Sequence, residues 1–386
     1  MQQIRCFLRK FLKGYVAVFL LLLSVLSFVS LGDLIMAYKT GETINNQITG
    51  DDRLESDLSA NIFAKDIFLN LNGGMRLLFG QREMNGVVRL ENGYLSELNA
   101  AIEESGMERN VRHLAEFKKD IQSHGIPFLY VLTPYKIQQE NSQLPQYMVD
   151  HTNGSLDIFI EKVNDAGVSP LDLREVFSQG DEDPYSLFYR TDHHWNIEGG
   201  FIAYTAIAQQ IADMLDVDLG SALLSRDQFY KKVYEGAHLG YYGQRTGSVF
   251  AGGADDFALW LPNFDTEIVN TNTGEKGTFE ELLINDEYLE EKRVSSRYTY
   301  DNVFMAGNFQ SLRSGCGKKI LFVSDSMGKA VLPFLVLTFG EICYVDANDP
   351  TDLTAELLQE YQPDIVVIMH YPLSAFTRER FDFLPV

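Results

Sequence analysis

The chain has 386 residues, 45% hydrophobic and 12% aromatic, which is enough apolar material for one large or two ordinary globular domains. Its 54 acidic residues outnumber its 32 lysines and arginines and give a net charge of −22, which disfavours nucleic-acid binding. The same charge repels a strongly polyanionic glycan unless a local basic patch compensates.

The N-terminus carries an apolar run long enough for one membrane-spanning helix. Residues 14–32 read GYVAVFLLLLSVLSFVSLG and extend through LIMAY, behind the cations Arg5, Arg9, Lys10 and Lys13. Because these cations come first, we predict a cytoplasmic tip at 1–13, a transmembrane anchor at 14–37 and an extracytoplasmic remainder. A cleaved signal peptide is the alternative; it is disfavoured because the run exceeds the usual ~7–15 residues and no A-x-A-like site follows.

A stalk and a folded domain are predicted after the anchor. Residues 38–84 are polar and then weakly helical, and we predict that they form the stalk. Residues 85–386 have the pattern of a folded domain. Within it, residues 216–300 are rich in glycine, tyrosine and acidic side chains and are predicted to form an insertion of irregular and β structure.

The rest of the domain alternates between amphipathic and continuously apolar segments. Helices are predicted at 107–125, 155–167, 196–215, 328–340 and 352–362, and strands at 126–134, 168–173, 318–326, 341–347 and 363–371. Apolar strands separated by helices predict an open, doubly wound α/β domain with a parallel sheet covered on both faces. In such a domain, sites form at the carboxyl ends of the strands.

The segment FYRTDHHWNIEGG, residues 188–200, concentrates residues that can carry chemistry. In an extended segment Asp192 and His194 project to the same side, so the carboxylate can accept the Nδ1 proton and leave Nε2 free as a base. His193 is then expected to point the opposite way, toward structure or substrate. Trp195 is expected to pack locally or to stack on a substrate, and the following asparagine to cap a helix.

A metal site at Asp192, His193 and His194 is the alternative reading of this segment, since all three side chains are competent ligands. It is disfavoured because adjacent residues diverge in an extended segment and no other cluster has ligand spacing. We therefore predict no metal and no cofactor. Cys6 lies in the predicted cytoplasmic tip, and the chain has two further cysteines, Cys316 and Cys343. We expect both to be free thiols, with a disulfide between them as the alternative.

A second constellation lies in KKILFVSDSMGKAV, residues 318–331, where a buried strand ends near Ser326 and a helix begins. A serine at such a turn is exposed at the carboxyl edge, and its own amide and the next ones lie at the positive helix N-terminus, where they can stabilise an oxyanion. By position alone a helix N-cap is the commoner role. The Asp192–His194 pair makes a nucleophile the favoured interpretation.

These motifs resemble those of the SGNH-hydrolase-like proteins of the alginate O-acetyltransferase group, most closely their relatives named for the Asp-His-His-Trp (DHHW) motif. The resemblance runs from about residue 85 to the C-terminus and rests on TDHHWN at 191–196 and SDSMGKAVLPFL at 324–335. TPYK at 133–136, FMAGNF at 304–309 and PDIVVIMHY at 363–371 add weaker support. It implies an SGNH-like fold.

The resemblance also implies residue roles. Ser326 is the nucleophile, His194 the general base and Asp192 the residue that orients it, in a permuted order compared with ordinary SGNH hydrolases. Ser324 stands where the wider class has glycine, which leaves the oxyanion geometry open. For substrate binding or oxyanion donors we name His193, Trp195, Lys136, Met327, Gly307 and Asn308.

For the weaker candidates the structural alternatives are a glycine turn at 307–308 and a solvated loop lysine at 136. HLGYYGQRTG, residues 238–247, supplies aromatics and an arginine that could line a glycan groove.

Three functions agree with these motifs. The first is transfer of an acetyl group to a cell-surface or exported polysaccharide, with a multi-pass membrane-bound O-acyltransferase as the donor that the resemblance implies. The second is a carbohydrate acetylesterase of the SGNH type, and the third an inactive scaffold or glycan-binding subunit of an export complex. We expect the 60 residues after Ser326 (386 minus 326) to hold only the remaining α/β elements, unlike the alginate-acting relatives that bear a C-terminal carbohydrate-binding module. With the net charge, this favours a neutral or differently charged glycan over alginate.

Overall fold

The computed structural model describes residues 65–102, 104–220, 225–290, 299–313, 315–349 and 353–376, together with a few positions between 16 and 29. The chain divides into two compact units, residues 1–75 and 76–386. The predicted anchor at 14–37 lies outside the described residues apart from those few positions. Within the described part of the chain, no helix combines the length and apolarity needed to cross a membrane.

The later part of the predicted stalk contains helix α3 (Lys65–Leu78). The second unit begins at Arg76. It opens with a small antiparallel sheet, in which β1 (Glu83–Met84) pairs with β2 (Val87–Arg89) and β2 pairs with β3 (Leu95–Ser96). Residues just before 85 therefore take part in the folded unit.

An eight-stranded sheet forms the centre of the second unit, in the order β5-β4-β13-β11-β12-β10-β8-β9. Five of its strands are parallel, as the apolar runs predicted: β4 (Phe128–Leu132), β5 (Leu171–Asp172), β11 (Lys318–Ser324), β12 (Gly340–Asp346) and β13 (Ile365–His370). The other three strands are antiparallel and extend one edge: β8 (Ile268–Asn270), β9 (Lys276–Gly277) and β10 (Phe309–Ser311). The sheet is thus mixed, and the predicted insertion contributes β8 and β9 to it.

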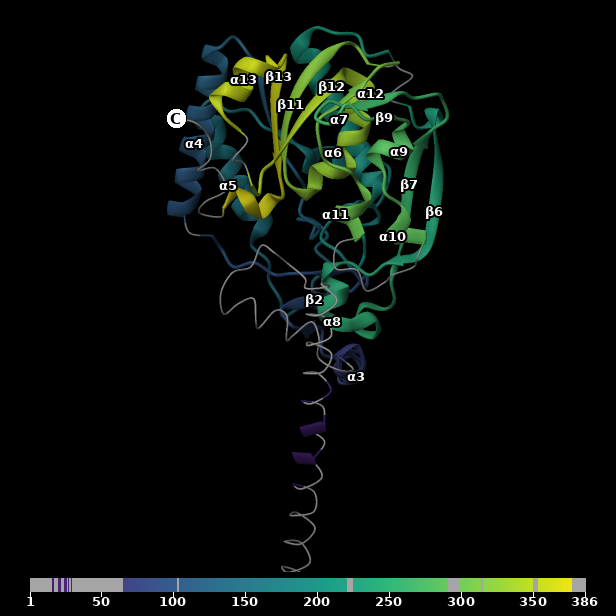
Figure 1. Cartoon of the computed structure of the whole chain (residues 1–386). Coiled ribbons are helices and arrows are strands. Elements are labelled where there is room, and N and C mark those ends of the chain that lie inside the picture. Colours follow the sequence, from purple (N-terminus) through teal and green to yellow (C-terminus); the bar gives the residue numbers. More distant parts are fainter. Residues whose placement is uncertain are drawn as a thin grey trace, which may run out of the picture. The chain divides into compact units, whose positions relative to one another are not determined.

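Helices cover both faces of this sheet (Figure 1). Alternate residues of β11 point to opposite faces, so Ile320 and Phe322 join one core and Leu321 and Val323 the other. The first core packs under α6 (Leu173–Gln179), α7 (Ile197–Leu215) and α12 (Leu332–Phe339). The second packs under α4 (Glu104–Ser123), α5 (Thr152–Asp165) and α13 (Ala355–Tyr361). This is the predicted doubly wound arrangement.

The insertion contains more regular structure than the sequence predicted. A long two-stranded ribbon pairs β6 (Phe229–His238) with β7 (Asp255–Pro262), and α8 (Tyr241–Ala251) lies between them in the chain. Short helices follow at α9 (Phe279–Leu283), α10 (Glu287–Glu290) and α11 (Thr299–Val303). Single 3-10 turns occur at Pro184–Leu187, Arg226–Gln228, Ser326–Ala330 and Pro372–Ala375.

Cys316 and Cys343 remain thiols, as expected.

The turn after β11 is shaped by a size match between Ser324 and Gly328. A Cβ atom on Gly328 would overlap the Ser324 hydroxyl and lie 2.6 Å from Ser324 Cβ and 2.9 Å from the Phe322 ring. The glycine thus leaves the space that the serine side chain fills.

Gly328→Ala is expected to destabilise the protein by about 1–3 kcal/mol, because the added methyl group overpacks this turn. Ser324→Gly combined with Gly328→Ala should recover part of that loss, since it removes the main obstructing atoms. Urea denaturation of the two single variants and the double variant measures the coupling. Strictly additive losses would contradict the size match.

Candidate active site

The carboxyl ends of β4, β11 and β13 meet at one edge of the sheet, and the turn that begins with Ser326 lies there. Asp325 caps this turn: its buried carboxylate accepts the Met327 N–H at 3.0 Å and the Tyr371 N–H at 2.7 Å. The loop after β13 is thereby tied to the turn after β11. Ser326, the first residue of the turn, keeps a half-buried side chain that points at His194.

The loop that carries Asp192 and His194 is closed at its base by local contacts. Phe188 and Trp195 form an antiparallel bridge, and the Tyr189 N–H donates to the His194 carbonyl at 3.1 Å. As predicted, Asn196 caps α7: its side-chain Oδ1 accepts the Glu198 N–H at 3.0 Å and the Gly199 N–H at 3.3 Å. The loop is held between a bridge and a capped helix, so its side chains have fixed directions.

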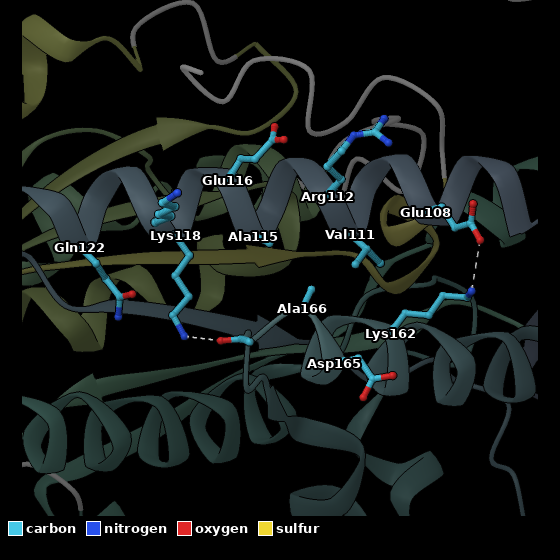
Figure 2. Close-up of a pocket in the computed structure, with 12 residues that line it drawn as sticks. Glu108, Val111, Arg112, Ala115, Glu116, Lys118, Gln122, Lys162, Asp165 and Ala166 are labelled. Atoms are coloured by element: carbon cyan, nitrogen blue, oxygen red, sulfur yellow. Dashed lines mark hydrogen bonds and ion pairs between the residues drawn. The ribbon is translucent and has the colours of Figure 1, made fainter.

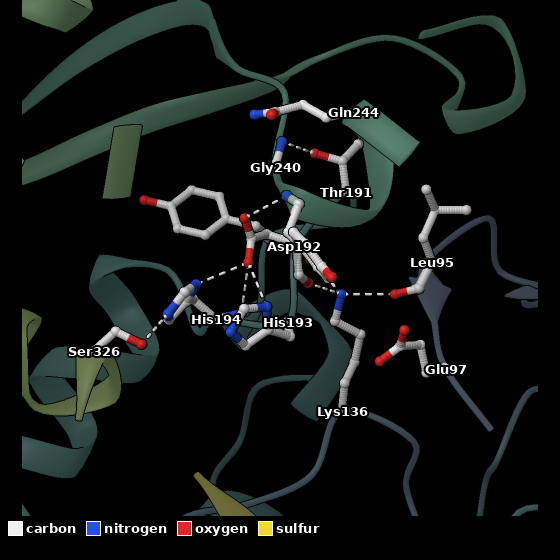
Figure 3. A network of polar contacts seen from close by, with 12 residues as sticks. Leu95, Glu97, Lys136, Thr191, Asp192, His193, His194, Gly240, Gln244 and Ser326 are labelled. Atoms are coloured by element: carbon white, nitrogen blue, oxygen red, sulfur yellow. Dashed lines mark hydrogen bonds and ion pairs between the residues drawn. The ribbon is translucent and has the colours of Figure 1, made fainter. Parts of the chain in front are cut away.

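The structure brings Ser326, His194 and Asp192 into one hydrogen-bonded line (Figure 3). His194 Nε2 lies 2.7 Å from Ser326 Oγ, and His194 Nδ1 lies 2.8 Å from Asp192 Oδ1. A carboxylate accepts the Nδ1 proton, which leaves the Nε2 lone pair to accept the serine proton. The His194 ring also stacks on Tyr300, with centroids 4.1 Å apart and planes 14° apart.

Asp192 is buried, and several donors converge on its carboxylate. Oδ1 accepts the His194 N–H at 3.1 Å as well as the ring, and His193 Nδ1 lies 3.1 Å from it. Oδ2 accepts the Tyr241 N–H at 2.8 Å, and His238 Nε2 lies 3.3 Å away. Burial alone would raise the pKa of Asp192, but the charges of His194 and His193 and their hydrogen bonds hold it well below its usual range.

His193 does not point away from this carboxylate, so that expectation was wrong. The backbone at 191–194 bends and is not extended, which lets both histidine rings reach the same oxygen, with ring centroids 3.9 Å apart. Burial first, and then the charge of His194, lower the pKa of His193. A two-residue alternation cannot be assumed in a bend.

The bend also removes the spacing argument against a metal. The ligand atoms of Asp192, His193 and His194 lie within 4.8 Å of one another. The inward nitrogens, however, already have partners: both Nδ1 atoms face Asp192, and His194 Nε2 faces Ser326. A cation would have to replace these protons, so the donor set fits a hydrogen-bonded triad better than a metal centre.

Lys136 is neither a substrate contact nor a solvated loop lysine. It is 2% exposed, and its ammonium donates to the carbonyls of Leu95 at 2.9 Å, Tyr189 at 2.8 Å and Asp192. Three N–H groups with three acceptors leave none for a substrate. Burial lowers the pKa of Lys136 to about 7. The residue clamps the loop of Asp192 to β3 and to the end of β4.

Two other candidates also have structural partners. Trp195 is fully buried and stacks on Phe177 with centroids 6.0 Å apart, so it packs in the core and does not face a substrate. Asn308 accepts the Tyr344 N–H at 2.9 Å and donates to Asn272 at 3.0 Å. The Asn308 side-chain amide therefore forms hydrogen bonds at the edge of the sheet. Gly307 precedes it in a bend.

Met327 is buried, and its N–H donates to Asp325. The Gly328 N–H donates to the same residue's carbonyl at 3.1 Å. Among the described residues, the Ser326 N–H meets no acceptor, which makes it the donor of this turn that remains for an oxyanion. The Ser326 N–H is therefore available to an oxyanion, whereas the Met327 and Gly328 N–H groups, which the sequence also suggested, already donate to Asp325.

Sequence reasoning missed the part that the insertion plays. Gly240 lies so close to the acid that a Cβ would come within 2.7 Å of Asp192 Cγ. Asp255, at the start of β7, accepts the Thr191 N–H at 2.8 Å and the Thr191 hydroxyl at 2.6 Å. His238 and Gly240 lie in the segment singled out for glycan binding, but nothing in its pattern indicated contact with the DHHW loop.

A groove of about 710 Å³ lies elsewhere, between α4 and α5 (Figure 2). Charged side chains bridge it: Lys162 lies 3.4 Å from Glu108, and Lys118 donates to the Gly167 carbonyl at 2.6 Å. None of the residues that line it belongs to the triad. We treat it as a gap between two packed helices.

Residues 94–281 match the family model described as SGNH hydrolase-like domain, acetyltransferase AlgX. The resemblance indicated by the motifs is confirmed. A search of curated protein sequences found no significant match.

Solved structures show the same fold. PatB1 of Bacillus cereus, solved with a sulfonyl adduct, is 17% identical with a TM-score of 0.61, over 78% of this chain and 99% of PatB1. A DHHW family protein of Eubacterium siraeum is 18% identical with a TM-score of 0.58, over 78% of this chain and 96% of its own. The chain therefore has a mixed α/β, SGNH hydrolase-like fold.

Asp192 is expected to make stability depend on pH. Its pKa is lower in the folded protein than its ordinary value of 3.8, so its contribution is present above about pH 4 and is lost as the pH falls through the folded pKa. Each unit of pKa difference corresponds to about 1.4 kcal/mol. Urea denaturation at pH 7 and pH 3 should show a larger loss for the wild type than for Asp192→Asn.

The exposed Asp181, changed to asparagine, is the matched control and should keep the wild-type loss. An Asp192→Asn variant that loses as much stability in acid as the wild type would contradict the assignment.

Proposed function

We propose that this chain is an O-acetyltransferase that modifies a polysaccharide outside the cytoplasm through an acetyl group carried on Ser326. The observation that carries the proposal is the line from Ser326 Oγ through the His194 ring to Asp192 Oδ1, with both contacts below 3 Å. The match to the AlgX acetyltransferase domain supports the choice of acyl group.

The chemistry divides into two transfers. In the first, His194 Nε2 takes the Ser326 proton as Oγ attacks the acetyl carbonyl, and the same proton then passes to the departing group of the donor. In the second, His194 takes the proton of an acceptor hydroxyl as that oxygen attacks the acetyl-serine. The ester moves to the acceptor, and the serine recovers its proton. Asp192 stabilises the charged imidazole in both steps.

Negative charge that develops on the carbonyl oxygen needs donors that are already in place. The Ser326 N–H has that role in the proposal, because the next two amides donate to Asp325. The turn is rigid, since Asp325 is bonded both to it and to the loop after β13. A rigid donor requires little reorganisation during the reaction.

The acetyl donor has to be supplied from the membrane, because acetyl-CoA is cytoplasmic. We assign this role to a multi-pass membrane-bound O-acyltransferase, which the resemblance implies. The apolar run at 14–37 would then anchor the chain in the cell membrane close to that partner, with the domain on the extracytoplasmic side.

The same triad would also serve an acetylesterase, with water in place of the sugar hydroxyl. A scaffold without activity is the third candidate, but it gives no reason for a half-buried serine within 2.7 Å of a histidine. The experiment below separates the three.

Full-length protein in detergent is expected to transfer acetyl groups from p-nitrophenyl acetate to a polysaccharide acceptor. Ser326→Ala and His194→Ala should each lower the rate by about 10⁴-fold, because each removes a member of a unit that works together. Ser178→Ala, an exposed serine, is the matched control and should keep full activity. A sulfonyl fluoride should inactivate the wild type at Ser326, by analogy with the adduct of PatB1.

Acetate release without any transfer would replace the proposal with the esterase. Full activity of the Ser326→Ala variant would contradict both the acetyltransferase and the acetylesterase.

A further inference from the structure

An aromatic patch, formed by His193, Tyr241 and Tyr371, lies beside the proposed base. The His193 ring stands edge-on to Tyr371, with centroids 5.2 Å apart, and edge-on to Tyr241 at 5.9 Å. On its other side it is 3.9 Å from the ring of His194. The patch therefore begins directly next to the triad.

Tyr241 is the exposed member of the patch, with 48% of the residue open to solvent, whereas its neighbour Tyr242 is buried. Its backbone is fixed to the triad, because its N–H donates to Asp192 Oδ2 at 2.8 Å. The Arg245 guanidinium lies over the ring, 5.1 Å from the centroid. The ring is held in place on one side and is open to solvent elsewhere.

The members of the patch are aromatic rings, without a lysine, arginine or carboxylate. Burial, and then the charge of His194, lower the pKa of His193, which disfavours its charged form, and burial raises the pKa of Tyr371. Arg245 is paired with Glu97 and donates to the Asn85 carbonyl. Its positive charge is compensated within the protein.

The other cations around the site also have partners. Lys136 is spent on three carbonyls, Arg190 donates to carbonyls of residues 251–254, and Arg89 donates to the Phe250 carbonyl. Lys329, in the turn that begins with Ser326, is not free either. A uronate carboxylate would need a charged donor here, and each of these described cations would first have to leave its present partner.

We infer that the aromatic patch is an acceptor subsite and that the ring of Tyr241 stacks on a neutral sugar residue of the polysaccharide. Pyranose rings present apolar C–H faces, which pack on aromatic rings, and an uncharged surface imposes no desolvation of a paired ion. His193 separates Tyr241 from the base, so the stacked sugar is a neighbour of the one that receives the acetyl group. The inference rests on the proposed function for the identity of the acceptor.

Saturation-transfer NMR titration of the full-length protein in detergent tests it. The probes are three neutral hexasaccharides, the β-1,4-linked oligomers of glucose, mannose and N-acetylglucosamine, and a β-1,4-linked mannuronate hexamer as the anionic probe. At least one neutral probe is expected to bind more tightly than the mannuronate. Tyr241→Ala should weaken that binding about tenfold, in line with the loss of one central aromatic contact.

Tyr241→Phe keeps the ring and should retain binding, and Tyr147→Ala, at a 71% exposed tyrosine, is the matched control. Thermal unfolding of all variants checks that they are folded. Tighter binding of the mannuronate, binding of no neutral probe, or wild-type binding by Tyr241→Ala would overturn the inference.

Hydrolysis of p-nitrophenyl acetate, measured on the same wild-type sample, keeps the two proposals apart. Hydrolysis without binding of a neutral glycan overturns the subsite and leaves the proposed chemistry standing. Neutral-glycan binding that depends on Tyr241, without hydrolysis, supports the subsite and counts against the acetyl-enzyme.

Discussion

The buried carboxylate of Asp192 is the constraint on which the rest of the site depends. A carboxylate that leaves water costs several kcal/mol unless donors and opposite charge compensate it. Here the donors come from two segments that are distant in sequence: the DHHW loop supplies His193 and His194, and the insertion supplies the Tyr241 N–H. The insertion therefore contributes directly to the environment of the acid, through the Tyr241 N–H that Oδ2 accepts.

The same carboxylate links the fold to the chemistry. The buried Lys136 side chain donates a hydrogen bond to the backbone carbonyl of Asp192. The loop therefore cannot shift without breaking this hydrogen bond of a buried group. With the acid fixed, His194 has one ring orientation that satisfies both of its nitrogens, and Tyr300 stacks on its face. Ser326 meets that ring because β11 ends at the same edge as β4 and β13. The pre-formed line of contacts follows from these supports.

The sequence predicted the parallel core well, because long apolar strands between amphipathic helices have few other solutions. It also placed Asp192, His194 and Ser326 in one hypothesis, since their chemical types and strand-to-turn position point to one mechanism. It failed for His193 and Lys136. The orientation of His193 depends on a backbone bend, and the burial of Lys136 depends on carbonyls from three other segments. Neither feature leaves a recognisable pattern in the neighbouring sequence. The same is true of the contacts that His238 and Tyr300 make with the site.

The central claim is that Ser326 carries the acetyl group. Peptide-level mass spectrometry, after brief exposure of the full-length protein to an acetyl donor and an acid quench, tests it most directly. The account predicts the mass of one acetyl group on the peptide that contains Ser326, with fragment ions that place it on that residue, and its disappearance when a glycan acceptor is added before the quench. An acetyl group on another residue, such as His193, or none under conditions where the acceptor becomes acetylated, would contradict it.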